Sequence, residues 1–220
     1  ADAVYIGAPK YGARAAASNT LEDIAELVAF AHQYYVRIYV ALNTLIYEDE
    51  LPEVERMIWK LWEIGVDALI VQDMGITKLN LPPIPLHAST QCDNRTPEKV
   101  KFLQDAGFRQ VVLARELSIP QIKAISQQTN VALEAFIHGA LCVSYSGQCY
   151  MSYALGGRSS NRGVCAQFCR LPYDLVDAKG KVLMRDKYLL SLRDLQRSKQ
   201  DIEALIDAGI TSFKIEGRLK

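Results

Sequence analysis

Apolar positions along the chain follow one recurring arrangement: an amphipathic helix ends at a glycine, and a short apolar strand follows. It occurs where MIWKLWEIG ends at Gly65 before VDALIVQ, where KVKFLQDAG ends at Gly107 before FRQVVLA, and where DIEALIDAG ends at Gly209 before ITSFKIE. Glycine suits the left-handed conformation that ends many helices, and strands that are apolar throughout are typical of parallel strands covered by helices. The pattern therefore predicts an α/β fold built by βα repetition.

The same periodicities locate the individual elements. Strands are predicted near 3–7, 37–42, 68–72, 84–88, 110–114, 131–137 and 211–216, and helices near 20–34, 51–64, 96–106, 118–128 and 201–208. Thr20 followed by Asp23 is typical of a helix start, and Pro97 after Thr96 suits a first helical turn.

The repetition breaks between residues 139 and 200. The first part of this stretch is rich in Gly and Ser and holds four of the five cysteines of the chain, Cys142, Cys149, Cys165 and Cys169. In the second part, 172–200, two alternating runs flank a turn at 178–180, which predicts a hairpin beside the cysteines.

The four cysteines are separated by six, fifteen and three residues. A single cysteine would most simply be an unpaired, partly buried thiol, but four in so short a segment indicate a shared role. Disulfides fit poorly with a chain that otherwise looks like an intracellular enzyme. Structural zinc sites usually use two Cys-x-x-Cys pairs, which are missing here. The loose spacing therefore favours an iron–sulfur cluster, with zinc as the alternative occupant.

Composition and charge narrow the possible partners. The 220 residues are 50% hydrophobic with 25 basic and 25 acidic side chains, so any RNA site must be a local patch. Arginines gather near the cysteines, and guanidinium groups bind phosphates and carboxylates; both RNA and a small anionic co-substrate suit them. No apolar run approaches the roughly 18 residues of a membrane helix and no leader is visible, so we expect a cytoplasmic protein with no membrane partner.

Polar side chains stand where the predicted strands end, and those ends would meet at one mouth in a barrel. The candidates for catalysis are His87, Gln91, Arg115, Glu134, His138, Lys214 and Glu216, and the candidates for cofactor binding are Arg14, Arg162, Arg170 and Arg218. Structural interpretations stay open: Glu134 as the ion-pair partner of Lys214 or an arginine, His87 and His138 as hydrogen-bonded structural histidines, and Arg115 as the partner of Glu116 in a loop salt bridge.

Several long motifs resemble one known family. They are EAFIHGALCVSYSGQCYMS at 134–152, HASTQCD at 87–93, ARELS at 114–118, NRGVCAQFCRLPY at 161–173 and SFKIEGR at 212–218. The chain resembles the collagenase-like peptidases of unknown catalytic type, family thirty-two. The stretch DALIVQDMGI at 67–76 is similar to the branch of this family that hydroxylates C5 of a pyrimidine, making 5-hydroxycytidine in 23S ribosomal RNA.

The resemblance implies an RNA-modifying enzyme with a 4Fe-4S cluster on the four cysteines, prephenate as a possible co-substrate, and RNA, above all ribosomal RNA, as partner. A collagenase-like peptidase is one alternative, although the chain has no His-Glu-x-x-His or Gly-x-Ser-x-Gly motif. A noncatalytic, metal-stabilised RNA-binding module is another.

The resemblance also makes the prediction of the fold more specific. Family members carry a further strand and helix ahead of the first strand seen here, so the seven predicted strands become eight, and we expect a TIM-type (β/α) barrel without its first βα unit and last helix. An open doubly wound sheet is the alternative, but no Gly-x-Gly-x-x-Gly turn follows a strand. Residues 1–220 are expected to form a single barrel-like domain of a longer protein, with 139–200 as a Cys-rich insertion and hairpin.

Overall fold

A curled parallel sheet forms the centre of the computed structural model, which describes residues 1–17 and 19–216. The strand order is β1-β2-β3-β4-β5-β6-β10, and all neighbours along it are parallel. The strands are β1 (Ala3–Gly7), β2 (Arg37–Leu42), β3 (Ala68–Val71), β4 (Leu86–Ala88), β5 (Gln110–Val112), β6 (Ala132–Gly139) and β10 (Ser212–Ile215). The predicted α/β repetition is confirmed.

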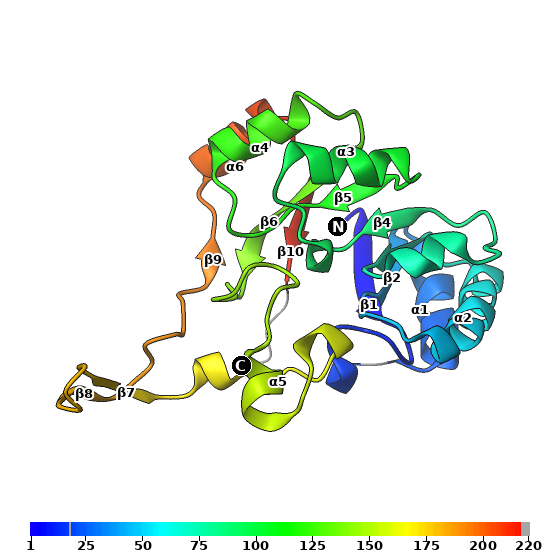
Figure 1. Ribbon diagram of the computed structural model, residues 1–220. Helices are drawn as coiled ribbons and strands as arrows, with labels where there is room; N and C mark the ends of the chain where they lie inside the picture. The colour runs from blue at the N-terminus through cyan, green and yellow to red at the C-terminus, as the bar shows by residue number, and fades with distance from the viewer. Residues whose placement is uncertain (18, 217–220) are drawn as a thin grey trace.

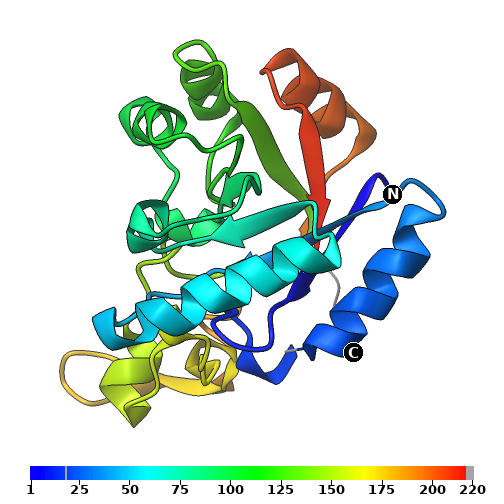
Figure 2. The same ribbon diagram turned by 90° about the vertical axis from the view of Figure 1, so that its right-hand side faces the viewer.

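Five helices cover the outer side of this sheet (Figures 1 and 2). They are α1 (Leu21–His32), α2 (Leu51–Ile64), α3 (Pro97–Asp105), α4 (Ile119–Ser126) and α6 (Lys199–Asp207). Gly65, Gly107 and Gly209, which follow α2, α3 and α6, have φ of +97°, +96° and +96°. The left-handed helix ends predicted from the sequence are therefore present.

The two faces of the sheet differ in chemistry. Side chains that face the helices are apolar: Ile38, Val40 and Leu42 of β2 pack in one core cluster with Ile24 and Val28 of α1. The alternate positions, which turn to the inner face, include Tyr39 of β2, His87 of β4, Glu134 of β6 and Lys214 of β10. The inner face thus carries buried charged and polar side chains among apolar ones, where the interior of a closed barrel is usually apolar.

Curvature brings the two edge strands toward each other. Lys214 of β10 lies with its Nζ 3.9 Å from the ring centroid of Tyr5 in β1. Burial lowers the pKa of His87, and the charge of Lys214 adds to this shift although β5 lies between β4 and β6 and β6 lies between β5 and β10. Between the described residues no backbone pairing joins β10 to β1. The sheet is therefore curled but open along this seam, and a closed barrel stays a prediction.

The chain between β6 and α6 leaves the sheet. It forms α5 (Met151–Gly156), the antiparallel hairpin of β7 (Tyr173–Val176) and β8 (Val182–Lys187), and β9 (Leu195–Gln196), which pairs antiparallel with the end of β6. Figure 1 shows the hairpin projecting away from the sheet. Six short 3-10 turns complete the elements: η1 (Ala15–Ala17), η2 (Glu48–Glu50), η3 (Met74–Lys78), η4 (Thr90–Cys92), η5 (Ser160–Arg162) and η6 (Phe168–Arg170). Within residues 1–17 and 19–216, no helix has the length and apolar character needed to span a bilayer.

Candidate functional site

Residues 140–172, here called the cysteine strap, run from the end of β6 to the start of β7 and lie across the carboxyl ends of the strands (Figure 1). Backbone hydrogen bonds tie the strap to the loops that follow β1 and β2. Ala15 N donates to Gly163 O at 3.1 Å, and Leu45 N donates to Asn161 O at 3.0 Å. The strap is thereby held over the mouth where the polar residues were predicted to meet.

Two glycines allow the backbone of the strap to touch the body of the protein. A Cβ on Gly147 would lie 2.0 Å from Gln91 O, and a Cβ on Gly163 would lie 2.4 Å from Gly12 O. Both glycines have positive φ, +74° and +80°, which disfavours any other residue. These positions require glycine because both the close approach and the backbone conformation exclude a side chain.

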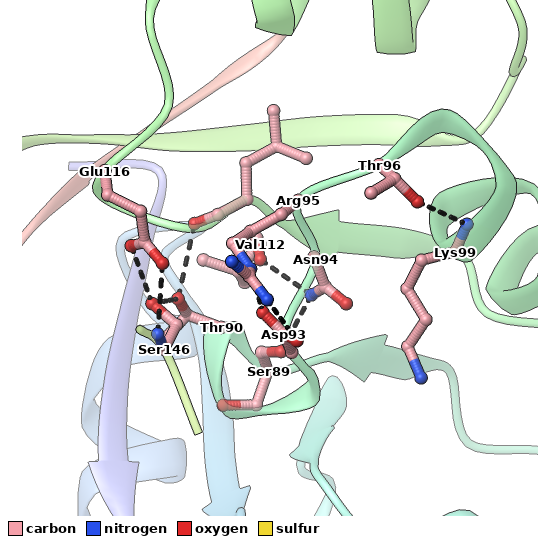
Figure 3. A network of polar contacts seen from close by, with 11 residues as sticks. Ser89, Thr90, Asp93, Asn94, Arg95, Thr96, Lys99, Val112, Glu116 and Ser146 are labelled. Atoms are coloured by element: carbon pink, nitrogen blue, oxygen red, sulfur yellow. Dashed lines mark hydrogen bonds and ion pairs between the residues drawn. The ribbon is translucent and has the colours of Figure 1, made fainter. Parts of the chain in front are cut away.

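Glu116 holds the first half of the strap from the loop after β5 (Figure 3). Its Oε1 accepts a hydrogen bond from Ser146 N at 3.1 Å, and its Oε2 accepts one from Ser146 Oγ at 3.1 Å. Thr90 Oγ1, buried in η4, lies 3.3 Å from Ser146 Oγ and 3.3 Å from Leu113 O. One carboxylate and one hydroxyl therefore fix the backbone between Cys142 and Cys149.

The cysteines of the strap are free thiols; Cys142 and Cys165 are exposed, and Cys149 and Cys169 are partly buried. Burial raises the pKa of the Cys169 thiol; Arg170 opposes this shift, and the charges of Cys142, Cys165 and Cys149 add to it. Electrostatic effects between side chains weaken with distance. The other three cysteines therefore lie near enough to Cys169 to influence its charge.

The surroundings of Cys165 suit a thiolate ligand. Its Sγ accepts a hydrogen bond from Gln167 N at 3.4 Å and lies 3.8 Å from Ser152 Oγ. Backbone and hydroxyl donors to sulfur are typical of iron–sulfur sites. Gln167, the donor, has a left-handed φ of +57°.

Within the described part of the chain, no three His, Cys, Asp or Glu side chains are grouped so as to hold a metal ion. A tetrahedral zinc ion, with Zn–S bonds of about 2.3 Å, needs sulfurs within about 4 Å of one another. A polynuclear cluster is wider and spreads its ligands further apart. A four-thiolate centre on these cysteines, with a 4Fe-4S cluster or zinc as its occupant, stays a prediction.

Glu216, just beyond β10, joins two arginines across the mouth. Arg14 Nη2 donates to its Oε1 at 2.5 Å, and Arg115 Nη2 donates to its Oε2 at 2.9 Å. The Arg115 guanidinium also stacks over the ring of Phe136 at 4.0 Å. The expected loop salt bridge between Arg115 and Glu116 is wrong: the two neighbours point to different partners, Arg115 to Glu216 and Glu116 to the strap.

Lys214 and Glu134 form a buried ion pair on the inner face, as the structural interpretation of Glu134 predicted. Lys214 Nζ lies 3.4 Å from Glu134 Oε2, and both side chains are 8% exposed. Burial lowers the pKa of Lys214, even though the Glu134 carboxylate favours its charged form. Burial, helped by the charge of Glu216, raises the pKa of the neighbouring Tyr5 to about 12. A catalytic role for Lys214 or Glu134 stays a prediction.

His87 lies on the same face and is 7% exposed. Its ring packs edge-on against Tyr39 with centroids 4.8 Å apart, and its Nδ1 has no hydrogen-bond partner among the described residues. Burial, with the charge of Lys214 second, lowers its pKa to about 4. The interpretation of His87 as a fully hydrogen-bonded structural histidine is therefore wrong, and the imidazole is neutral at pH 7.

The other predicted residues are dispersed around the mouth. Gln91 contributes its carbonyl, which accepts from Gln72 Nε2 at 3.2 Å. His138 is exposed at the end of β6. Arg162 donates to both carboxylate oxygens of Glu50 at 2.6 Å. Arg218 lies outside the described residues.

Arg170 is the candidate with the closest tie to the cysteines. It donates to Leu141 O at 2.5 Å and to Ser191 Oγ at 2.9 Å. It therefore joins the strap beside Cys142 to the segment after the hairpin, a structural contact that leaves its predicted cofactor role untested.

A cavity of about 250 Å³ opens beside the strap, at the carboxyl end of β1. Arg14 and Arg162, two of the predicted cofactor-binding arginines, line it together with Lys10, Tyr11 and Thr44. Sequence reasoning missed Glu116 and Thr90 as anchors of the strap. The signal in the sequence was Ser146-Gly147, a hydrogen-bonding residue beside a glycine inside the cysteine segment.

Comparisons with known proteins agree with this arrangement. The chain is 62% identical over 220 residues to the 23S rRNA 5-hydroxycytidine C2501 synthase of Escherichia coli strain K12, covering all of this chain and 34% of that protein. It is 38% identical over 230 residues to the tRNA hydroxylation protein P1 of Bacillus subtilis strain 168, covering all of this chain and 54% of that protein.

The chain thus spans between a third and about half of the length of these relatives. The solved structure of the U32 peptidase Mk0906 has a TM-score of 0.59 at 14% identity, covering 86% of this chain and 81% of that one, and so supports the fold. The family model of peptidase family U32 matches residues 1–220. The chain therefore belongs to peptidase family U32.

Proposed function

We propose that the protein is an RNA-modifying enzyme that hydroxylates C5 of a pyrimidine base, forming 5-hydroxycytidine in 23S ribosomal RNA. The observation that carries this proposal is the 62% identity, along the whole chain, with the E. coli 23S rRNA 5-hydroxycytidine C2501 synthase. The similarity to a tRNA hydroxylation protein of B. subtilis supports the wider class, hydroxylation of RNA bases.

The geometry of the mouth is compatible with this chemistry. A base modified at a ring carbon must leave its stack and enter a site that separates it from its neighbours. The mouth offers such a place, since the cysteine strap covers one side and the Arg14–Glu216–Arg115 bridge lies at the strand ends. An eighth strand in the seam between β10 and β1 would close the sheet into the predicted TIM-type barrel.

Cys142, Cys149, Cys165 and Cys169 would hold the 4Fe-4S cluster, which supplies one-electron chemistry when bound. The chain's own residues would bind and orient the RNA base and the co-substrate. In this proposal a small anionic co-substrate, for which the family resemblance implies prephenate, occupies the cavity lined by Arg14 and Arg162. Guanidinium groups suit carboxylates because they offer paired N–H donors, and here the co-substrate would share Arg14 with Glu216 and Arg162 with Glu50.

A peptidase is the second candidate, because the family carries that name. The described histidines give it little support. His32 pairs with Asp67, and His87 is buried with an unpartnered Nδ1, so neither is placed to activate a nucleophile. His138 is exposed at the end of β6, and no hydrogen bond from its ring to a nucleophile is present among the described residues. The cysteines that could serve as nucleophiles are the ones proposed as ligands.

The test is nucleoside analysis of 23S ribosomal RNA from cells with and without the gene. We expect 5-hydroxycytidine to disappear on deletion and to return with the wild-type gene or with Cys92→Ser, since Cys92 is a buried thiol of the core and not one of the four strap cysteines. Cys165→Ser should not restore it. An unchanged nucleoside profile after deletion would leave the noncatalytic RNA-binding module or the peptidase as the explanation.

A separate measurement addresses the cluster. Anaerobic purification followed by iron, sulfide and zinc analysis should give four iron and four sulfide per chain for a 4Fe-4S cluster. A colourless protein with one zinc ion would contradict the cluster, whatever the result of the nucleoside analysis.

A further inference from the structure

We propose that the cysteine strap is a binding surface for single-stranded RNA, in which exposed tyrosines stack on nucleobases and arginines contact phosphates. The inference rests on the proposed function, which makes RNA the substrate, and adds where the RNA lies. It follows from the charge of the strap, the exposure of its aromatic side chains, and the way two tyrosine rings at its borders are held.

The strap is positively charged in a protein whose formal net charge is zero. Residues 140–172 contain no Asp or Glu, and their three charged side chains are Arg158, Arg162 and Arg170. Arg162 is neutralised by Glu50. Arg158 and Arg170 form no ion pair with a described carboxylate; Arg158 uses its Nε on Val164 O, and Arg170 uses its donors on Leu141, Ser191 and Leu192. Neither guanidinium is paired with a described carboxylate, so both stay available to the phosphates of a polyanion.

Three tyrosines of the strap turn most of their surface outward. Tyr145, Tyr150 and Tyr153 are 60%, 64% and 63% exposed. Tyr150 precedes α5 directly and Tyr153 lies three positions later, so the two are neighbours on one side of that helix. Tyrosine rings that pack against the protein are normally more buried than this, so these rings have faces free for a partner.

Two rings beside the mouth are pre-oriented by arginines. The Arg95 guanidinium covers one face of Tyr145 at 4.0 Å from its centroid, and Arg95 is fixed by an ion pair with Asp93 (Figure 3 shows Arg95 and Asp93). On the other side of the strap, Arg162 covers Tyr47 at 4.2 Å, and Tyr47 is 62% exposed. Because each arginine is held by a carboxylate, it orients the ring and leaves the opposite face open.

An unpaired RNA strand is the partner that matches these features. Exposed aromatic rings next to positive charge bind single strands, since every base offers a face for stacking and the backbone follows the charge. Bases in a duplex are already stacked on each other, so the tyrosines would gain little from it. A loop of ribosomal RNA placed on the strap would bring an unstacked base to the mouth that the strap covers.

The test is fluorescence anisotropy with a labelled RNA of about 12 nucleotides, single-stranded and as a duplex. We expect tighter binding of the single strand. Tyr145→Ala and Tyr150→Ala should each weaken it at least about fivefold, while Tyr145→Phe should keep most of the affinity. Arg158→Gln should lower the slope of log Kd against log salt by about 1.

Tyr34→Ala is the matched control. Tyr34 is 64% exposed, like the strap tyrosines, but follows α1 at the opposite ends of the strands. The thermal unfolding of each variant is measured alongside, and Tyr145→Phe separates loss of stacking from loss of folding. If wild type binds the single strand and the strap variants bind it as well as Tyr34→Ala does, the inference is wrong while the proposed function stands. If the wild-type protein binds no single-stranded RNA, the inference is wrong, and the nucleoside analysis decides the proposed function separately.

Discussion

The buried histidine of the inner face gives the sharpest prediction. His87 is 7% exposed, and burial, with the nearby charge of Lys214, lowers its pKa from 6.5 to about 4. In the unfolded chain the imidazole takes up a proton below about pH 6.5. In the folded protein it stays neutral down to about pH 4. The folded state therefore loses stability as the pH falls through this window, because only the unfolded state binds the proton.

The magnitude follows from the two pKa values. Linkage gives a loss, relative to pH 7, of about 2 kcal/mol at pH 5 and about 3 kcal/mol at pH 4. Above pH 7, His87 no longer changes the free energy of unfolding with pH, since the imidazole is then neutral in both states. His87→Gln removes this titration and leaves the other ionisable groups in place, so the difference between the two proteins reports on His87 alone.

The assay is urea unfolding of wild type and His87→Gln at half-unit steps from pH 7 to pH 4. We expect the wild-type free energy of unfolding to fall more steeply, by about 3 kcal/mol over the whole range. His138→Gln, the same substitution at an exposed histidine, is the control for the exchange of His for Gln. Parallel curves for wild type and His87→Gln would show that His87 is not held neutral by burial.

Two further predictions concern the strap and the buried ion pair. Gly147→Ala should release the first half of the strap and speed its amide exchange, because the new Cβ would lie 2.0 Å from Gln91 O. Gly157→Ala, also at positive φ but with nothing within 4 Å, should cost only about 1 kcal/mol, and equal effects of the two changes would contradict the contact. Lys214→Met should destabilise the protein in urea by about 3 to 5 kcal/mol, since it leaves the Glu134 carboxylate buried and unpaired. Adding Glu134→Leu should recover much of that loss, and a stable single variant would contradict the pairing.

The parts of the fold that depend on local pattern could be predicted. The helix ends at Gly65, Gly107 and Gly209 could be predicted because glycine is the residue type that best suits the left-handed position after a helix. The pairing of Glu134 with Lys214 could be suggested as well, since two opposite charges on apolar strands rarely stay buried alone.

Contacts between distant residues could not be predicted. Arg14 and Glu216 meet across 202 positions of sequence, and Arg115 turns to the same carboxylate instead of its neighbour Glu116. The carboxylate with which an arginine pairs depends on the curvature of the sheet. No local sequence pattern predicts that curvature. The unpartnered Nδ1 of His87 could not be predicted for the same reason. The sequence shows a histidine on a strand, but it does not show which side chains surround the ring.

The seam between β10 and β1 has a consequence for association between molecules. Exposed strand edges invite other chains to add hydrogen-bonded strands, and proteins resist this by placing charged side chains at the edge. Here Lys214 and Glu134 sit beside one edge, and the Tyr5 ring lies under the lysine at the other. A strand that paired with β10 or β1 in this seam, whether from this protein or from another molecule, would lie beside an ammonium and a carboxylate that already pair with each other.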